Sequence, residues 1–120
     1  MERRRLGRTG HASPLAILGT AAFAEVEADA VAAALGLALE RGVNHLDVAP
    51  RYGRAEELLG PLLPKVRDRL FLACKTARHG ADGVRAQLEA SLAVLGTSSF
   101  DLYQLHAGTT VAELDARREA

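Results

Sequence analysis

The chain has 120 residues, a length that allows one domain with a buried core but not two. Its 15 basic and 15 acidic side chains cancel, so its charge gives no reason to expect nucleic acid or an anionic membrane as a partner. The longest apolar stretch, near residues 15–24, is too short to span a bilayer and is broken by a glycine. Cys74 is the single cysteine, which excludes an internal disulfide, and we expect a reduced, cytoplasmic protein.

A short hairpin and four strands are predicted along the chain. The hairpin would pair residues 4–6 with residues 11–12 across the turn at residues 7–10. Four apolar runs follow, each short and nearly continuous as in strands that are buried on both faces: Leu15–Leu18, His45–Val48, Leu70–Cys74 and Asp101–Leu105. Their starts lie 25 to 31 residues apart, the length that one strand and one helix need together.

Helical patterns fill the gaps between these runs. The first helix has an apolar stripe at helical spacing, made of Val31, Ala34, Leu35, Ala38 and Leu39. Residues 55–63 also favour a helix, which Pro61 interrupts. The third helix, expected to begin with a cap at Asp82 and to end at Gly96, has a second stripe made of Val84, Leu88, Ser91, Leu92 and Leu95. A fourth helix is predicted from the capping box at residues 110–113.

This alternation of strands and helices predicts an α/β fold with a parallel sheet. A doubly wound dinucleotide-binding sheet would need a glycine-rich turn after its first strand, and the turn at residues 18–23 has one glycine. The other candidate is a (β/α)8 barrel of the TIM type, which usually takes roughly 250 residues. We therefore expect a single partial domain over residues 1–120, with about the first four βα units of such a barrel behind the short N-terminal β-hairpin.

Ionisable side chains end three of the four predicted strands. The runs end in or near Thr20, Asp47, Lys75 and His106, and the active-site groups of a barrel lie at the C-terminal ends of its strands. Taken singly, Asp47 is explained as a loop cap, Lys75 as a solvated charge and His106 as a core or loop histidine. Burying an acid, a lysine and a histidine together is costly unless they pair, so their joint placement indicates a site.

Five segments resemble the aldo-keto reductase family, in the family's order. Residues 42–60, which read GVNHLDVAPRYGRAEELLG, are similar to the signature of that family. Residues 5–10 resemble the N-terminal hairpin of the family. Residues 18–20, 71–76 and 101–106 resemble its first, third and fourth strands. The resemblance covers nearly the whole chain. It departs from the family at Val48, where threonine or serine is common, and at Pro61 in the second helix.

The resemblance implies an oxidoreductase that uses NADPH to reduce an aldehyde or ketone to an alcohol, or that runs the reverse reaction. The catalytic tetrad of the family falls on Asp47, Tyr52, Lys75 and His106, with no member missing. Tyr52 would protonate the carbonyl oxygen, and a neighbouring Lys75 ammonium would favour its phenolate. His106 would donate a hydrogen bond to the carbonyl oxygen, and Asp47 would pair with Lys75.

The same resemblance gives this chain only part of a cofactor site. Its contacts to the cofactor NADPH (NADP+) would come from Gly19, Thr20 and Asp47, the last through the nicotinamide ribose. Strands five to eight of the barrel, which supply most cofactor contacts in the family, have no counterpart in the sequence. We therefore expect weak NADPH binding and little turnover by the chain alone, with a small carbonyl compound as substrate and no metal ion.

Two other interpretations stay open. The chain could be a metal-dependent barrel hydrolase with His45, Asp47 and His106 as ligands, although Lys75 would repel the cation. It could also be an inactive half-barrel relic or an interaction module. Strands one and four would then be open edges, which invite self-association or pairing with a C-terminal half.

Overall fold

The computed structural model describes residues 1–118, and residues 119 and 120, which end the expected 1–120 unit, lie outside the described residues. Two antiparallel strands open the chain, β1 (Arg3–Arg5) and β2 (Ala12–Pro14). The parallel strands are β3 (Leu18–Gly19), β4 (His45–Asp47), β5 (Phe71–Thr76) and β6 (Leu102–Leu105). The α-helices are α1 (Ala28–Glu40), α2 (Ala55–Leu59), α3 (Ala81–Leu95) and α4 (Val111–Asp115). Short 3-10 turns lie at Thr20–Phe23, Leu63–Lys65 and Arg67–Arg69.

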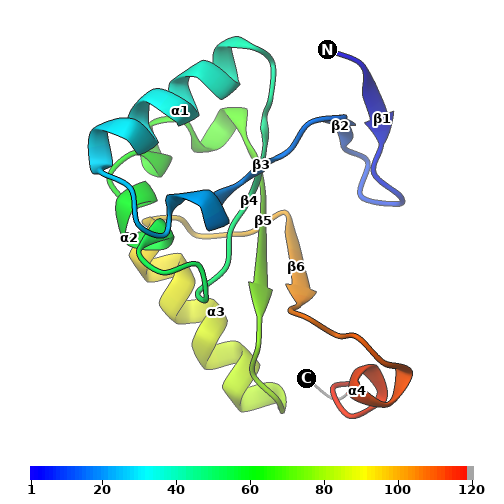
Figure 1. Ribbon diagram of the computed structural model, residues 1–120. Coiled ribbons are helices and arrows are strands. Elements are labelled where there is room, and N and C mark those ends of the chain that lie inside the picture. Colours follow the sequence, from blue (N-terminus) through cyan, green and yellow to red (C-terminus); the bar gives the residue numbers. More distant parts are fainter. Residues whose placement is uncertain (119–120) are drawn as a thin grey trace.

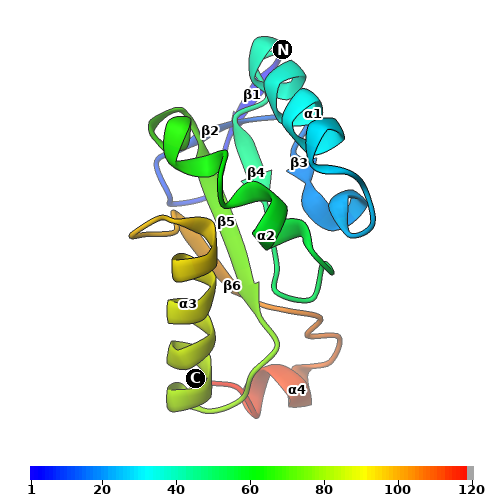
Figure 2. The same ribbon diagram turned by 90° about the vertical axis from the view of Figure 1, so that its left-hand side faces the viewer.

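The parallel strands form one sheet in the order β3-β4-β5-β6, which is also their order along the chain. Figure 1 shows α1, α2 and α3 together on one side of this sheet, and Figure 2 views the molecule from that side. A doubly wound sheet places helices on both faces, whereas a barrel places them on its outside alone. The arrangement therefore confirms the predicted segment of a parallel barrel behind an N-terminal hairpin, in which β3 and β6 are the edges of the described sheet.

An apolar core joins the sheet to its helices. The fully buried core residues come from the strands, from the helix faces that cover them and from the turns between these elements: Val31, Leu46, Val48, Ala55, Leu59, Leu63, Leu72, Cys74 and Leu95. Leu46 and Leu72 face the helices, so that their neighbours His45, Asp47 and Ala73 face the inside of the curved sheet. This alternation separates an apolar outer face from an inner face that becomes polar at one end.

The helix boundaries follow the predicted signals with one exception. α2 ends at Leu59, two residues before Pro61, and Gly96 closes α3 with a left-handed conformation (φ 62°). Asp82 does not cap α3, because the helix begins at Ala81 and its N-cap is Gly80. Asp82 instead lies in the first turn, where its charge still favours the helix dipole. Of the described helices, none has the length and apolarity needed to cross a membrane.

The first parallel strand is shorter than predicted. β3 contains Leu18 and Gly19, and the backbone bends at residues 15 and 16, directly after β2. Leu15 and Ile17 are consequently 54% and 48% exposed rather than paired in the sheet. The bend is needed because the chain turns from the antiparallel hairpin into the parallel sheet within this segment.

The hairpin covers the N-terminal end of the sheet. The His11 ring stacks on Phe71, the first residue of β5, with centroids 4.2 Å apart. His45, the first residue of β4, meets the Phe71 ring edge-on at 4.7 Å, and its Nδ1 lies 2.8 Å from the Ser13 hydroxyl oxygen. His11 is partly buried, because its ring lies in this stack.

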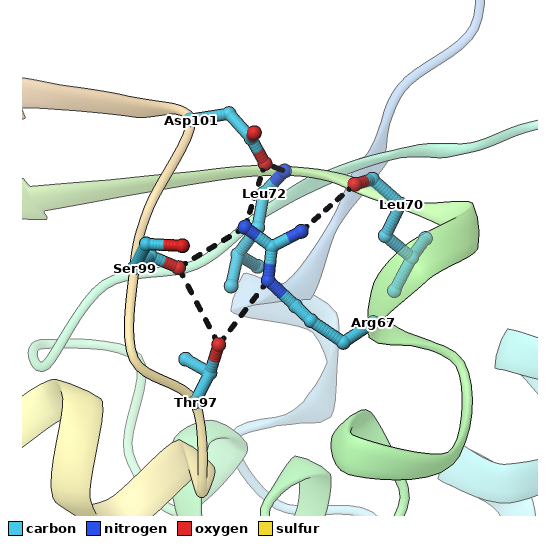
Figure 3. Close-up of polar contacts among 6 residues, drawn as sticks. All are labelled: Arg67, Leu70, Leu72, Thr97, Ser99 and Asp101. Atoms are coloured by element: carbon cyan, nitrogen blue, oxygen red, sulfur yellow. Dashed lines mark hydrogen bonds and ion pairs between the residues drawn. The ribbon is translucent and has the colours of Figure 1, made fainter.

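Arg67 ties the beginning of β5 to the loop that leads into β6 (Figure 3). Its guanidinium donates to the Leu70 carbonyl at 2.9 Å, to Thr97 Oγ1 at 3.2 Å and to the Ser99 carbonyl at 3.1 Å. It also pairs with the Asp101 carboxylate at 2.9 Å, which in turn accepts from the backbone N–H of Leu72 at 2.8 Å. One side chain thereby fixes where two neighbouring strands begin.

Candidate active site

The four ionisable residues singled out in the sequence meet at one end of the sheet. Asp47 and Lys75 lie near the C-terminal ends of β4 and β5, and His106 directly follows β6. Tyr52 comes from the loop between β4 and α2. Because the strands are parallel, these chain positions all lie at the same rim.

Lys75 is the centre of this group. Its Nζ donates a short hydrogen bond to Asp47 Oδ1 and lies 5.3 Å from the centroid of the Tyr52 ring. The Tyr52 ring in turn meets the His106 imidazole edge-on, with centroids 5.7 Å apart. The side chains of Lys75 and Asp47 are 15% and 25% exposed, so the ion pair is shielded from water but still reachable from the rim.

The surroundings of His106 favour its neutral imidazole. Burial lowers the pKa of His106, and the positive charges of Lys75 and Arg51 lower it further. Its backbone N–H donates to the Thr76 carbonyl at 2.8 Å, and its carbonyl accepts from Arg117 Nη1 at 2.8 Å. Nδ1 of His106 is buried without a hydrogen-bond partner among residues 1–118. One ring nitrogen of His106 is therefore not used in a hydrogen bond within the described residues.

The loop that carries Tyr52 is packed tightly against the connection between β3 and α1. Gly53 has φ 54°, and a Cβ built on it would come within 3.0 Å of the Ala24 Cβ and carbonyl oxygen. The Arg54 N–H donates to the Ala24 carbonyl at 3.5 Å, and the Tyr52 N–H donates to the Ala49 carbonyl at 3.0 Å. A glycine is required at residue 53 for both its conformation and its space.

The expected cofactor contacts at the end of β3 divide into two kinds. Gly19 is exposed, pairs in register with Asp47 and has nothing within 4 Å of where a Cβ would lie. The space beside Gly19 thus lets a ligand approach the backbone close to Asp47. Thr20 is fully buried, and its hydroxyl donates to the Asp47 carbonyl at 3.0 Å. Thr20 therefore positions Asp47, and its direct contact with a cofactor stays a prediction.

Two polar residues near the site were not singled out from the sequence. Ser13 contacts His45 below the ion pair, and Gln87 of α3 contacts the end of β5. Ser13 lies in a hairpin far along the chain from its partner, and no spacing rule links the two. The sequence does indicate that Gln87 lies near the sheet, since it comes three residues after Val84 at the edge of the apolar stripe of α3.

A cleft of about 350 Å³ lies outside the barrel wall between α2 and α3. Glu56 lines it together with residues of α3 and with Pro50 and Arg78, from the loops that follow β4 and β5. Burial raises the pKa of Glu56, and hydrogen bonding to Ser91 and Cys74 opposes part of that rise. The four tetrad side chains do not line this cleft, which is separate from their rim.

Two of the three candidate metal ligands, Asp47 and His45, are engaged in other contacts. Asp47 holds the Lys75 ammonium, and His45 Nδ1 faces the Ser13 hydroxyl one layer deeper in the sheet. Across residues 1–118, no three His, Cys, Asp or Glu side chains are grouped as a metal would need. The geometry therefore gives no support to a metal-dependent hydrolase.

Comparison with known proteins agrees with this geometry. The family model described as "Aldo/keto reductase family" matches residues 16–115. An uncharacterized oxidoreductase of Bacillus subtilis is 35% identical over 97 residues, which are 69% of this chain and 32% of that protein.

Solved structures show the same likeness over nearly the whole chain. A Pseudomonas aeruginosa chain described as an aldo-keto reductase superposes with a TM-score of 0.89 at 32% identity, covering 98% of this chain and 51% of that one. An aldo/keto reductase from Klebsiella pneumoniae, solved in complex with NADP and acetate, superposes with a TM-score of 0.76 at 32% identity, covering 87% and 38%. The chain spans about a third to a half of the length of these three proteins. With its motifs, its parallel barrel segment and the family match in agreement, the chain belongs to the aldo/keto reductase family.

Proposed function

We propose that this chain carries the catalytic groups of an NADPH-dependent reductase, which converts an aldehyde or ketone to an alcohol or runs the reverse oxidation. One observation carries the proposal: the Lys75 ammonium is bound by Asp47 and lies beside the Tyr52 ring, which itself contacts His106. A phenol, an ammonium and an imidazole that converge at an open rim can donate a proton to an oxygen and orient it.

Each side chain has a distinct task in this proposal. Bound NADPH supplies the hydride that reaches the carbonyl carbon. The Tyr52 hydroxyl gives its proton to the carbonyl oxygen, and the positive charge of Lys75 stabilises the phenolate that remains. Asp47 fixes the Lys75 ammonium, which would otherwise turn toward water.

His106 orients the substrate in this scheme. Because burial and neighbouring cations lower the pKa of His106, its imidazole is neutral at pH 7 and offers one N–H donor. A neutral donor directs the carbonyl oxygen toward Tyr52 without competing with it as an acid. We therefore assign proton donation to Tyr52 and orientation to His106.

NADPH is the proposed cofactor because the Klebsiella pneumoniae relative was solved with NADP and because the residues present fit its approach. Gly19 leaves open space next to Asp47, which can accept a hydrogen bond from a ribose hydroxyl. These residues would hold only the nicotinamide end. We accordingly propose that the chain alone binds NADPH weakly and turns over little.

The open sheet edges are the proposed place of a partner. β3 and β6 each have one neighbour in the described sheet, so their outer backbone groups are unpaired with another strand. A C-terminal half of a related barrel, or a second copy of this chain, could pair with these edges. Either partner would surround the tetrad, which now lies at an open rim.

Aldehyde-dependent oxidation of NADPH tests the proposal, measured with the chain alone and with a C-terminal half from a relative added. We expect activity on mixing, and we expect Tyr52→Phe to lower it at least roughly 100-fold, because general acid catalysis is lost. Tyr103→Phe is the matched control, since Tyr103 packs on the helix side of the sheet. Equal activity of Tyr52→Phe and wild type would exclude the proposed acid, and no activity in any mixture would favour an inactive half-barrel.

A further inference from the structure

One side chain of α3 holds the end of β5. Gln87 Oε1 accepts a hydrogen bond from Thr76 Oγ1 at 2.7 Å and a second from the Ala77 backbone N–H at 3.0 Å. Thr76 is 1% exposed, so its end of these bonds is shielded from water, whereas Gln87 lines the cleft between α2 and α3. They connect a helix on the outside of the barrel wall to the strand that carries Lys75.

The direction of these bonds is fixed by chemistry. The Ala77 N–H can only donate, so the amide of Gln87 must present its oxygen to it. Thr76 Oγ1 already accepts from the Arg78 N–H at 3.0 Å, so its own hydrogen is free for Gln87. Every donor in this small network therefore has one acceptor, and an alternative amide orientation would leave two donors facing each other.

Thr76 lies between two members of the tetrad. It directly follows Lys75 in β5, and its carbonyl accepts from the backbone N–H of His106 at 2.8 Å. A displacement of Thr76 therefore moves the Lys75 backbone on one side and the His106 backbone on the other. Gln87 restrains both through a residue that itself takes no part in the chemistry.

We propose that Gln87 is a positioning residue, which keeps Lys75 and His106 at the distances from Tyr52 that proton donation needs. The catalytic meaning of this inference rests on the proposed reductase function. The positioning itself is independent of the proposed function, because it concerns only how Gln87 and Thr76 hold the end of β5. Gln87 acts through Thr76 and Ala77, and it touches neither substrate nor cofactor.

Because the chain contains few lysines, an NMR signal can report on the surroundings of Lys75. The sequence contains two lysines, Lys65 and Lys75. Lys65 is exposed in a short 3-10 turn, whereas Lys75 is paired with Asp47, so lysine labelled with carbon-13 at Cε gives one reference signal and one site signal. Neither cofactor nor substrate is needed for this measurement.

Gln87→Met keeps the length of the side chain but removes both hydrogen bonds, and Gln87→Glu keeps an acceptor oxygen. We expect the Lys75 signal to move most of the way toward that of Lys65 in Gln87→Met and to return in Gln87→Glu. Glu89→Met is the matched control, because Glu89 is exposed on the same helix, and it should leave the Lys75 signal in place.

Thr76→Val removes the hydroxyl that donates to Gln87, and it provides the same test if Gln87→Met does not fold. It should displace the Lys75 signal as Gln87→Met does, and the double variant should add little, because both changes remove the same bond. An unmoved Lys75 signal in either folded single variant would overturn the inference. The NMR comparison decides the role of Gln87 and the reductase assay decides the function, so failure of one is distinguishable from failure of the other.

Discussion

Lys75 illustrates how single side chains set the electrostatics of the rim. Its ammonium is neutralised in part by Asp47, yet its charge still acts on the imidazole of His106, which meets the Tyr52 ring edge-on. The charge of Lys75 and that of Arg51 both lower the pKa of His106, while the charge of Asp47 raises it. The protonation state of the imidazole therefore reports whether the ion pair is in place.

Replacing Lys75 with methionine should raise the pKa of His106. Removing the cation makes protonation of the imidazole easier, and the released Asp47 carboxylate acts in the same direction. Titration of the four histidines by NMR measures the effect, and Lys65→Met should leave the His106 midpoint where it is in the wild type. A His106 midpoint that falls or stays constant in Lys75→Met would contradict the described geometry.

At the scale of elements, a cluster of three aromatic rings joins the N-terminal hairpin to the sheet. His11 and His45 pack with Phe71 where the hairpin meets the sheet, and burial lowers the pKa of both histidines. Arg3 adds to the effect on His11, while Asp101 opposes it. Both rings are therefore neutral in the folded chain at pH 7.

Acid should loosen this hairpin. A histidine whose pKa is lowered by folding binds protons more readily when unfolded, so its stabilising contribution is complete above the ordinary value of 6.5 and is lost as the pH falls through the folded value. The free energy of unfolding in urea should drop as the pH falls below 6.5. His11→Phe, which can keep the stack on Phe71, should weaken this pH dependence. His79→Phe, in an exposed loop, should retain it.

Arg67→Lys should destabilise the fold by about 1–3 kcal/mol, because lysine cannot reproduce the forked donation to two carbonyls and a carboxylate. Urea unfolding followed by circular dichroism measures the change. Arg85→Lys on the exposed face of α3 is the control and should change the free energy of unfolding by less than about 0.5 kcal/mol. If Arg67→Lys lowers the free energy of unfolding no more than the control does, the contacts of Figure 3 contribute little to stability.

Across the whole molecule, the sequence predicted what depends on local pattern. The parallel order followed from the strand and helix alternation, and the tetrad from its place at strand ends and its family motifs. Helical spacing places Gln87 beside the apolar stripe of α3, but its hydrogen-bond partners could not be predicted, and neither could the stacking of His11 or the burial of Thr20. Each depends on which distant residue the fold brings near. Asp82 was misassigned because sequence spacing does not separate an N-cap from the first helical turn.

The close approach of Gly53 to Ala24 links two parts of the rim mechanically. Tyr52 is adjacent to Gly53, and Ala24 ends the turn that begins at Thr20, next to the proposed nicotinamide position. A Cβ on residue 53 would lie only 3.0 Å from Ala24, and the Arg54 N–H donates to the Ala24 carbonyl, so a shift of one segment acts on the other. A ligand that displaces the β3–α1 connection on arrival would therefore carry the phenol with it, so that cofactor docking and placement of the proton donor become a single movement.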